Sequence, residues 1–269
     1  MINPSRLLCT LGFSLSLISA AGAVGTGDTQ IYGSYNLGCI ANAQAFPLQG
    51  EHYVTQQWGP KRNYAAPQMI DYLTKLTARA KEAGLPPLII GDLSAPRGGP
   101  YGKSNHASHM IGLDVDIPFG FAPDLPRTLT TPQSFYLVRN GRLTDSFDAE
   151  RIKLIYLAAQ DERVERIFVA PRIKEGMCKL YAHDPTNDKW LRRLRPWFGH
   201  RAHMHVRLSC PPDSPYCVAQ AATPAGNGCG EELRSWFLPP DPHAKPVKPK
   251  SKVKPQWPQQ CKVLLHLAN

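Results

Sequence analysis

The sequence lacks the motifs that would assign it to several common hydrolase mechanisms. It contains no H-E-x-x-H pair of a helical metalloprotease and no G-x-S-x-G turn of a serine hydrolase. One S-x-x-K occurs, from Ser251 to Lys254, but it lies in a Pro/Lys-rich stretch that offers no rigid pocket. A serine penicillin-binding mechanism is therefore disfavoured. No C-x-x-C pair occurs either, which argues against a zinc site built from cysteines.

Long hydrophobic runs are also missing, except at the N-terminus. Residues 1–23 combine Arg6, an uncharged apolar run over 7–20 and small residues at 21–23. This is the pattern of a cleaved secretory signal peptide, and it is too short for a membrane span. Cys9 precedes most of the run, so it does not occupy the place of a lipid-anchored cysteine. We expect an exported, soluble protein without membrane insertion.

Acidic residues are scarce relative to basic ones, with 21 Asp and Glu against 31 Lys and Arg and a formal net charge of +10. Charge alone does not choose between nucleic acid, an anionic membrane surface and an acidic polymer such as a cell wall. The secretion signal and the absence of a basic helix argue against a nucleic-acid binder.

Six cysteines remain after the signal peptide, namely Cys39, Cys178, Cys210, Cys217, Cys229 and Cys261. An even number in an exported protein predicts three disulfides. A turn-rich segment separates Cys210 from Cys217, so a local bridge between them is the pair that the residues favour. The other pairings stay open.

Hydrophobic periodicity predicts a single α+β domain over residues 24–238, with a small central antiparallel sheet, flanking helices and long disulfide-tied loops. Helices are expected over 66–83, 148–163, 171–181 and 187–194, a short element over 231–238, and strands over 53–56, 88–93, 112–117, 134–139, 165–170 and 203–208. Residues 25–47 show no sustained period and are predicted to be irregular. Residues 239–269 begin with a Pro/Lys-rich extended strap that Cys261 ties back to the body.

Histidines and aspartates gather in two stretches, 104–119 and 199–208, which hold five of the nine histidines. His203, His205 and Arg207 alternate with apolar residues, and so do Asp114 and Asp116. This alternation predicts two strands, each presenting imidazole or carboxylate groups on one polar face. Three ligands of mixed nitrogen and oxygen type with a fourth position open are typical of a catalytic zinc ion. The residues therefore indicate a zinc hydrolase, with a closed structural zinc site as the alternative.

The pattern of His109, Asp116 and a distant His203-x-His205 resembles the zinc motif of the superfamily that contains lysostaphin-type enzymes, D-Ala-D-Ala peptidases and hedgehog domains. The surrounding segments GDLSAPRGGPYGKSNHASHMIGLDVDI, RIFVAPRIK and LRRLRPWFGHRAHMHVRLSCP resemble penicillin-insensitive murein endopeptidases of Gram-negative bacteria. The resemblance covers nearly the whole mature chain. It implies a periplasmic enzyme that cleaves D-alanyl–meso-diaminopimelyl cross-links in peptidoglycan.

The resemblance also implies roles for single residues. His109, Asp116 and His205 would bind zinc, and His203 would be the general base with His200 beside it. His106 matches a position credited with metal or substrate contact. A family Asp-x-x-His metal pair corresponds to Asp145 and Asp148, where aspartate replaces the histidine. The implied disulfides are Cys39–Cys261, Cys178–Cys229 and Cys210–Cys217.

Two other functions fit the same residues. A zinc D,D-carboxypeptidase would release terminal D-Ala, whereas a cross-linked substrate needs a cleft that is open on both sides. A non-catalytic wall-binding protein would keep zinc for structure, but such a site needs no spare base at position 203. Arg97, Lys103 and Arg207 are candidates for holding substrate carboxylates, and the spacing does not choose among them. The oligomeric state is not indicated.

Overall fold

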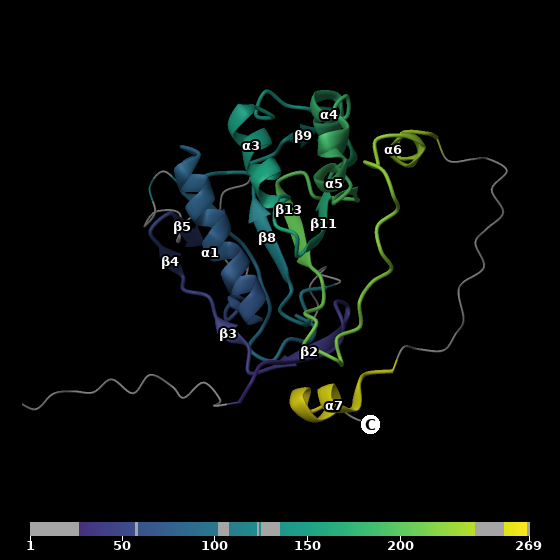
Figure 1. Cartoon of the computed structure of the whole chain (residues 1–269). Helices are drawn as coiled ribbons and strands as arrows, with labels where there is room; N and C mark the ends of the chain where they lie inside the picture. The colour runs from purple at the N-terminus through teal and green to yellow at the C-terminus, as the bar shows by residue number, and fades with distance from the viewer. Residues whose placement is uncertain are drawn as a thin grey trace, which may run out of the picture.

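Four strands, in the order β12–β11–β13–β8, form the sheet at the centre of the molecule (Figure 1). The structure is a computed structural model that describes residues 27–56, 59–101, 108–122, 124, 135–239 and 256–267. The predicted signal peptide, the S-x-x-K at 251–254 and most of the predicted strap lie outside these residues. Within the central sheet β8, β13 and β11 are antiparallel, and the short edge strand β12 is parallel to β11.

The described chain contains helices and short strands in mixed order. The strands are β1 (Gln30–Ser34), β2 (Leu37–Ala41), β3 (Gln44–Ala45), β4 (Gln49–Gly50), β5 (Tyr53–Thr55), β6 (Tyr64–Ala65), β7 (Leu88–Ile90), β8 (Asp114–Pro118), β9 (Val138–Arg139), β10 (Arg142–Leu143), β11 (Val164–Val169), β12 (Leu194–Pro196) and β13 (His203–Leu208). The helices are α1 (Pro67–Glu82), α3 (Ala149–Ala158), α4 (Pro171–Tyr181), a 3-10 turn at Pro185–Asn187, α5 (Asp188–Leu191), α6 (Glu231–Ser235) and α7 (Gln259–Leu265). The predicted single α+β domain is confirmed.

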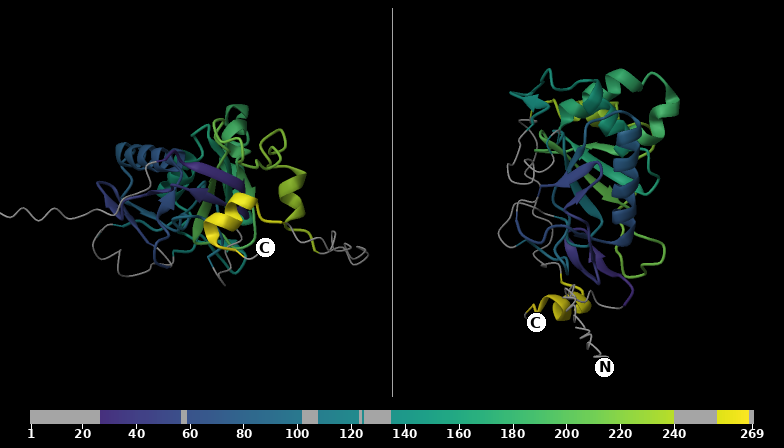
Figure 2. Two further views of the ribbon diagram at one scale, coloured as in Figure 1. Left: turned by 90° about the horizontal axis from the view of Figure 1, so that it is seen from below. Right: turned by 90° about the vertical axis from the view of Figure 1, so that its left-hand side faces the viewer.

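Helix α1 runs along one side of the central strands, and α3, α4 and α5 cover their other end (Figures 1 and 2). Pro67 occupies the first turn of α1, where its missing N–H costs nothing, and Gly84 follows the helix with a φ of 73°. One continuous apolar core lies between α1, α3, α4 and the sheet. Asp148 caps α3 by accepting a hydrogen bond from the N–H of Arg151. The predicted helices over 66–83 and 171–181 are thus confirmed.

Four predicted element boundaries were wrong. Residues 30–41 are not irregular, because β1 and β2 pair as an antiparallel hairpin, in which Gly33 of β1 has a φ of 81°. Helix α3 ends at Ala158, five residues early, since Asp161 turns the chain by accepting from the N–H of Arg163. The helix predicted over 187–194 ends at Leu191, and Leu194 instead begins β12, which pairs with β11. The strand predicted over 134–139 is limited to β9 among the described residues.

Three disulfides stabilise the fold. Two of them join segments that are distant in the sequence, and the third closes a short loop. Cys39–Cys261 fastens α7 to β2, although 222 residues separate them. Cys178–Cys229 ties α4 to the segment before α6, and Cys210–Cys217 closes the loop after β13. These are the three pairs that the family resemblance implies. Because long loops lose the most entropy on closure, the first bridge has the largest expected effect on the unfolded chain.

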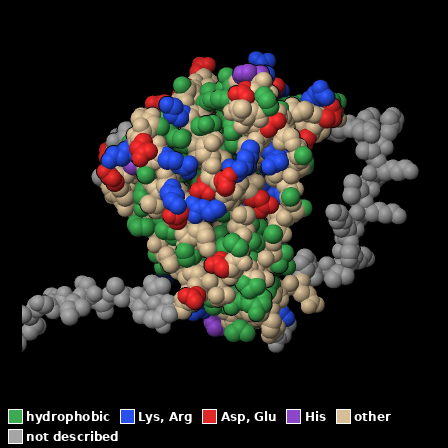
Figure 3. All heavy atoms as spheres, in the orientation of Figure 1, with side chains coloured by type: hydrophobic (Ala, Val, Ile, Leu, Met, Phe, Trp, Pro, Cys, Tyr) green, Lys and Arg blue, Asp and Glu red, His purple; other side chains and the backbone are tan. Residues whose placement is uncertain are grey.

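Charged side chains of both signs are intermixed on the face shown in Figure 3. Asp71 of α1, for example, pairs with Lys75 and with Arg163. Within the described part of the chain, no helix has the length and apolar character needed to cross a membrane.

Lys174 of α4 is a buried cation away from the central sheet's histidines. Its Nζ donates to the carbonyl oxygens of Leu191 at 2.7 Å and Asn227 at 2.6 Å. Burial, with a smaller contribution from Arg195, lowers the pKa of Lys174 to about 7. The lysine therefore connects α4 to α5 and to the segment that precedes Cys229.

We expect Lys174 to make stability depend on pH. Its pKa is about 7 in the folded protein and about 10.4 in an unfolded chain. Between these values the unfolded chain binds more protons, so the free energy of unfolding rises with pH. In Lys174→Met this contribution is absent. The difference in unfolding free energy between the wild type and the variant should therefore grow from pH 7 to pH 9, by at most about 1.4 kcal/mol per pH unit.

Urea denaturation without reductant measures this difference. Lys179→Met is the matched control, because Lys179 lies on the same helix with its side chain 72% exposed. A pH-independent difference for Lys174→Met would contradict the assignment.

Candidate metal centre

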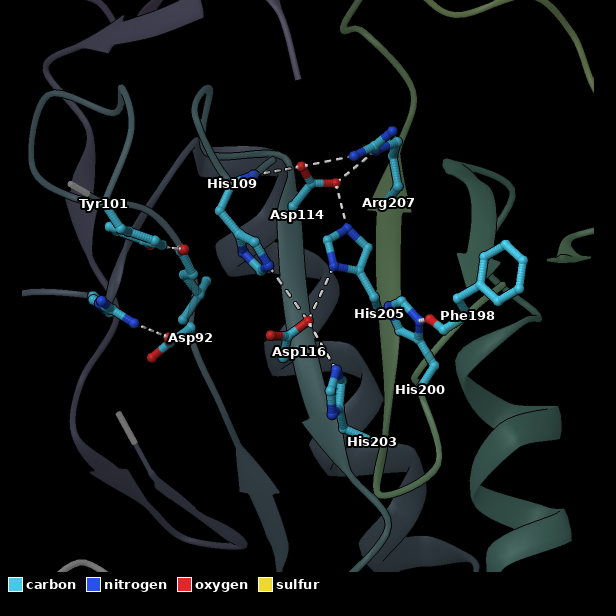
Figure 4. Close-up of polar contacts among 12 residues, drawn as sticks. Asp92, Tyr101, His109, Asp114, Asp116, Phe198, His200, His203, His205 and Arg207 are labelled. Carbon is cyan, nitrogen blue, oxygen red and sulfur yellow. Dashed lines mark hydrogen bonds and ion pairs between the residues drawn. The ribbon is translucent and has the colours of Figure 1, made fainter. Parts of the chain in front are cut away.

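The cross-strand register of β8 and β13 brings together residues about ninety positions apart in the chain. His205 lies opposite Asp116, and Arg207 lies opposite Asp114. Directly opposed residues in an antiparallel pair have Cβ atoms about 5 Å apart. Because side chains alternate along each strand, these four residues share one face of the sheet. The two predicted polar faces are therefore a single continuous cluster (Figure 4).

His109, Asp116 and His205 form the one group of potential metal ligands found among the described residues. One ligand atom from each lies within 4.8 Å of the other two, and all three residues are buried. The Oδ1 of Asp116 is 3.4 Å from Nε2 of His109 and 3.0 Å from Nδ1 of His205. Ligand atoms around a tetrahedral ion with bonds near 2.1 Å lie about 3.4 Å apart. The three side chains therefore fit a metal ion with a fourth position open.

Asp114 contacts both histidines of this group of potential ligands, called here the triad, without belonging to it. Its Oδ1 lies 3.0 Å from Nε2 of His205, and its Oδ2 accepts a hydrogen bond from the backbone N–H of His109 at 3.0 Å. A neutral His205 that donates from Nε2 to Asp114 keeps its Nδ1 lone pair directed at the triad. The guanidinium of Arg207 donates to both oxygens of Asp114, at 2.7 and 3.2 Å. One carboxylate thus orients two ligands.

The backbone is closely constrained at His109 and beside Asp116. His109 has a φ of 69°, a conformation that residues with a Cβ rarely adopt, and the hydrogen bond to Asp114 stabilises it. On the other side of β8, the N–H of Gly91 donates to the carbonyl of Asp116 at 2.8 Å. A Cβ at Gly91 would lie 2.8 Å from that same oxygen, so only glycine fits there.

The electrostatics of the cluster favour a bound cation. Burial alone would raise the pKa of Asp114, but Arg207 and His205 outweigh it and lower the pKa well below its usual range. Burial likewise opposes ionisation of Asp116, and the neighbouring His109 and His203 lower its pKa. Burial lowers the pKa of His205, yet the two carboxylates raise it to about 9. A divalent cation would compete with a proton for this imidazole.

The triad opens into a pocket of about 490 Å³ whose other walls contain His200, His203, Phe168 and Arg166. His203 is 36% exposed, and its Nε2 lies 3.8 Å from Oδ1 of Asp116. His200 donates from Nδ1 to the carbonyl of Phe198 at 2.7 Å, so its Nε2 carries the lone pair. Burial, then repulsion by His203, lowers the pKa of His200 to about 4. At neutral pH His200 is therefore an uncharged acceptor.

The structure brings some of the other predicted residues to this site and leaves others away from it. Asp145 lies exposed in the turn before α3, and in the described part of the chain no potential ligand group includes it. Arg97 contacts the carbonyl of Leu264 and the ring of His266 near the C-terminus. Arg207 is engaged by Asp114 as described. His106 and Lys103 lie outside the described residues.

Sequence reasoning missed two residues at the site. The orienting role of Asp114 was not predicted, although its register position opposite Arg207 follows once the two strands are paired. Arg166 lines the pocket from β11, where it pairs with Arg207 across the sheet. No sequence signal separated Arg166 from the other arginines, because its place depends on the β11–β13 register.

Comparison with known proteins agrees with this geometry. Residues 31–266 match the family model of penicillin-insensitive murein endopeptidases. The chain belongs to this family. The curated protein of that name from Haemophilus influenzae (strain Rd) is 43% identical over 248 residues, which cover 90% of this chain and 85% of that protein. The one from Escherichia coli O157:H7 (strain EC4115) is 43% identical over 245 residues, covering 89% and 87%. A third, from Shigella boydii serotype 18, is 42% identical over 248 residues, covering 89% and 87%.

In this member of the murein endopeptidase family, Asp114→Asn should weaken metal binding. The asparagine cannot accept from both Arg207 and His205 as a charged group, so His205 loses its fixed orientation. We expect the affinity for Zn²⁺ to fall about 10- to 100-fold. Competition with a chromogenic chelator measures this without any assay of activity.

The control for this variant is Asp92→Asn. Asp92 is also buried and pairs with an arginine, since Nη1 of Arg62 lies 2.6 Å from its Oδ2. Both substitutions break a buried ion pair, which costs about 3–5 kcal/mol, whereas the Asp114 carboxylate also contacts His109 and His205. Equal Zn²⁺ affinity in the two variants would contradict the orienting role of Asp114.

Proposed function

We propose that the protein is a zinc-dependent murein endopeptidase that hydrolyses D-alanyl–meso-diaminopimelyl cross-links in peptidoglycan. The observation that carries the proposal is the His109–Asp116–His205 triad, which forms one wall of an open pocket with His203 and His200 beside it. Membership of the penicillin-insensitive murein endopeptidase family supports the substrate class. Two imidazoles and one carboxylate are the donor set that a catalytic zinc ion prefers.

We place the mature protein in the periplasm. The charge and apolar pattern of residues 1–23 is that of a signal peptide that directs export. All six cysteines after this segment are paired in disulfides, as expected in an oxidising compartment. Murein is reached from that side of the inner membrane. The strap over 239–258 would link the folded body to α7.

The residues around the triad have distinct roles in hydrolysis. When bound, zinc supplies a Lewis acid and a water molecule whose pKa is lowered toward neutrality. His203 is half-exposed at the pocket wall, and we assign it as the base that accepts the proton of the attacking water. The same imidazole then returns this proton to the leaving amine of diaminopimelate. His200 is uncharged at neutral pH, and its Nε2 is available to accept a hydrogen bond from the substrate or from water in the pocket.

This reaction involves no serine acyl-enzyme, so a β-lactam ring has no nucleophile to acylate. A zinc D,D-carboxypeptidase would use the same groups on a terminal D-Ala. A non-catalytic wall-binding protein would need the triad but not His203.

We expect His203→Ala to lower kcat on purified cross-linked muropeptide dimers by about 10²- to 10⁴-fold, because general base catalysis is lost. Zinc content should remain that of the wild type, since His203 is not one of the three ligands. Chromatography of the products, with and without a chelator, is the measurement. His183→Ala is the control, as His183 is exposed and lines another pocket.

The products separate the alternatives. Chelator-sensitive conversion of dimers to monomers is the expected result. Release of free D-Ala alone would identify a carboxypeptidase. A zinc-loaded wild type without turnover would favour the wall-binding protein.

Arg166 is the arginine that we assign to the substrate. Hydrolysis of the cross-link leaves an amine on the same carbon that carries a diaminopimelate carboxylate, so that carboxylate lies next to the scissile bond. Arg166 lines the pocket, its Nη2 contacts the carbonyl of Ala221 and lies 3.5 Å from a carboxylate oxygen of Glu165, and its Nε is buried with no hydrogen-bond partner among the described residues. A carboxylate would satisfy this nitrogen.

Arg166→Gln should therefore lower kcat/KM on dimers with a free carboxylate by about 10- to 100-fold, the equivalent of one charge-assisted hydrogen bond. The wild type should lose a similar factor when this carboxylate is amidated, and the two losses should not add. Arg234→Gln, which alters an exposed arginine of α6, is the control. Additive losses would show that Arg166 and the carboxylate do not meet.

A further inference from the structure

Three aromatic side chains, Trp197, Phe198 and Trp236, form a continuous surface beside the pocket, called here the aromatic platform. The ring of Trp236 lies 4.9 Å from that of Phe198 and 6.3 Å from that of Trp197. Trp197 and Phe198 line the pocket, and they are 51% and 77% exposed. The platform thus continues the pocket wall outward onto the surface.

The aromatic platform is fixed by contacts in both segments that carry it, the turn after β12 and the residues after α6. Trp197 and Phe198 follow β12, where the N–H of Trp197 donates to the carbonyl of Val169 and the ring of Trp197 packs on Phe168 at 5.6 Å. Trp236 follows α6, whose Leu233 is buried in the core. The Cys178–Cys229 disulfide anchors the chain just before α6. The rings are therefore positioned before any ligand arrives, which lowers the entropy cost of binding.

The chemistry of the platform favours a neutral, ring-shaped ligand. None of its three side chains carries a charge, and the neighbouring Arg195 is already paired with Glu232. Aromatic faces are electron-rich, so they attract the C–H groups that a pyranose ring presents on its flat face. A contiguous patch of exposed aromatic rings beside a pocket is typical of a binding surface. An N-acetylated amino sugar meets these requirements, whereas a charged peptide does not.

The spacing of the rings matches the length of a murein stem peptide. Successive ring contacts of 5.5 Å from His205 to Phe168, 5.6 Å to Trp197 and 6.3 Å to Trp236 place Trp236 within roughly 17 Å of the triad histidine. In murein, four residues separate the scissile D-alanyl carbonyl from the sugar. An extended peptide of that length spans about 14 Å. A sugar on the stem of a bound cross-link therefore reaches the platform.

We propose that the aromatic platform of Trp197, Phe198 and Trp236 binds an amino-sugar ring of the glycan strand while the attached stem peptide occupies the pocket. This inference rests on the proposed function, because it takes murein as the substrate. Figure 4 shows Phe198 directed away from the triad, while its carbonyl oxygen accepts from His200. The turn thus presents one face to the cross-link and the other to the glycan.

The test compares two substrates that differ only in the sugar. One is a cross-linked muropeptide dimer that retains its disaccharides, and the other is the same dimer freed of sugar by an amidase. The wild type should cleave the sugar-bearing dimer with a kcat/KM about 10-fold higher, the equivalent of roughly 1–2 kcal/mol for one aromatic contact. In Trp236→Ala this preference should fall to within twofold of unity. Trp236→Tyr should restore part of it.

Tyr216→Ala is the matched control. Tyr216 is an exposed aromatic that packs against Tyr32 and does not line the pocket, so its loss should leave the sugar preference unchanged. Circular dichroism and the melting temperature establish that each variant is folded. Quenching of tryptophan fluorescence by a neutral N-acetylglucosamine tetramer measures binding without catalysis, and Trp236→Ala should weaken it.

The other outcomes would refute either the glycan assignment or the proposed endopeptidase activity. A folded Trp236→Ala that keeps the wild-type sugar preference, or a wild type with no preference, refutes the glycan assignment. Equal losses on both substrates would assign the platform to the stem peptide instead. If the wild type cleaves neither dimer but still binds the tetramer, the proposed endopeptidase activity fails while the sugar site stands.

Discussion

The buried carboxylate of Asp114 is the group on which the centre of this structure depends. Its side chain is inaccessible to solvent, yet it accepts from the Arg207 guanidinium twice, from the His109 backbone and from His205. Burial of an unpaired carboxylate would cost several kcal/mol, so the four contacts must be present together for the fold to be stable. If one of these contacts is lost, the remaining ones no longer offset the free-energy cost of burying the carboxylate. The cluster is therefore rigid because of electrostatics as well as packing.

That rigidity is what a metal site of three protein ligands requires. His109 comes from a loop, Asp116 from β8 and His205 from β13, and none of the three disulfides joins these segments directly. The sheet register sets the distance between Asp116 and His205, and Asp114 sets the position of the His109 loop. Cross-strand pairing and one shared carboxylate thus perform the alignment that a covalent bridge would otherwise provide.

Strand alternation explains why the triad could be predicted from the sequence and why Asp114 could not. A period of two places His203, His205 and Arg207 on one face, and the HxxxxxxD spacing with the family resemblance selects His109 and Asp116. The same period places Asp114 and Asp116 on one face as well, so nothing local distinguishes a ligand from its support. Only the antiparallel register, which pairs Asp114 with Arg207, separates the two roles. For the same reason Trp236, which lies 28 residues beyond the end of β13, carried no signal.

The β1–β2 hairpin and β12 were missed for a related physical reason. Both are short, and their stability comes from partners distant in sequence rather than from local propensity. At the site, the same tertiary dependence divides the pocket into two sides. Arg207 in the pocket wall and its partner Asp114 behind it are buried and hold their charges fixed, whereas His203, Trp197 and Phe198 are more exposed. Among the described residues His203 therefore lies on the more accessible side of the triad, which is where the proposed mechanism needs its proton acceptor.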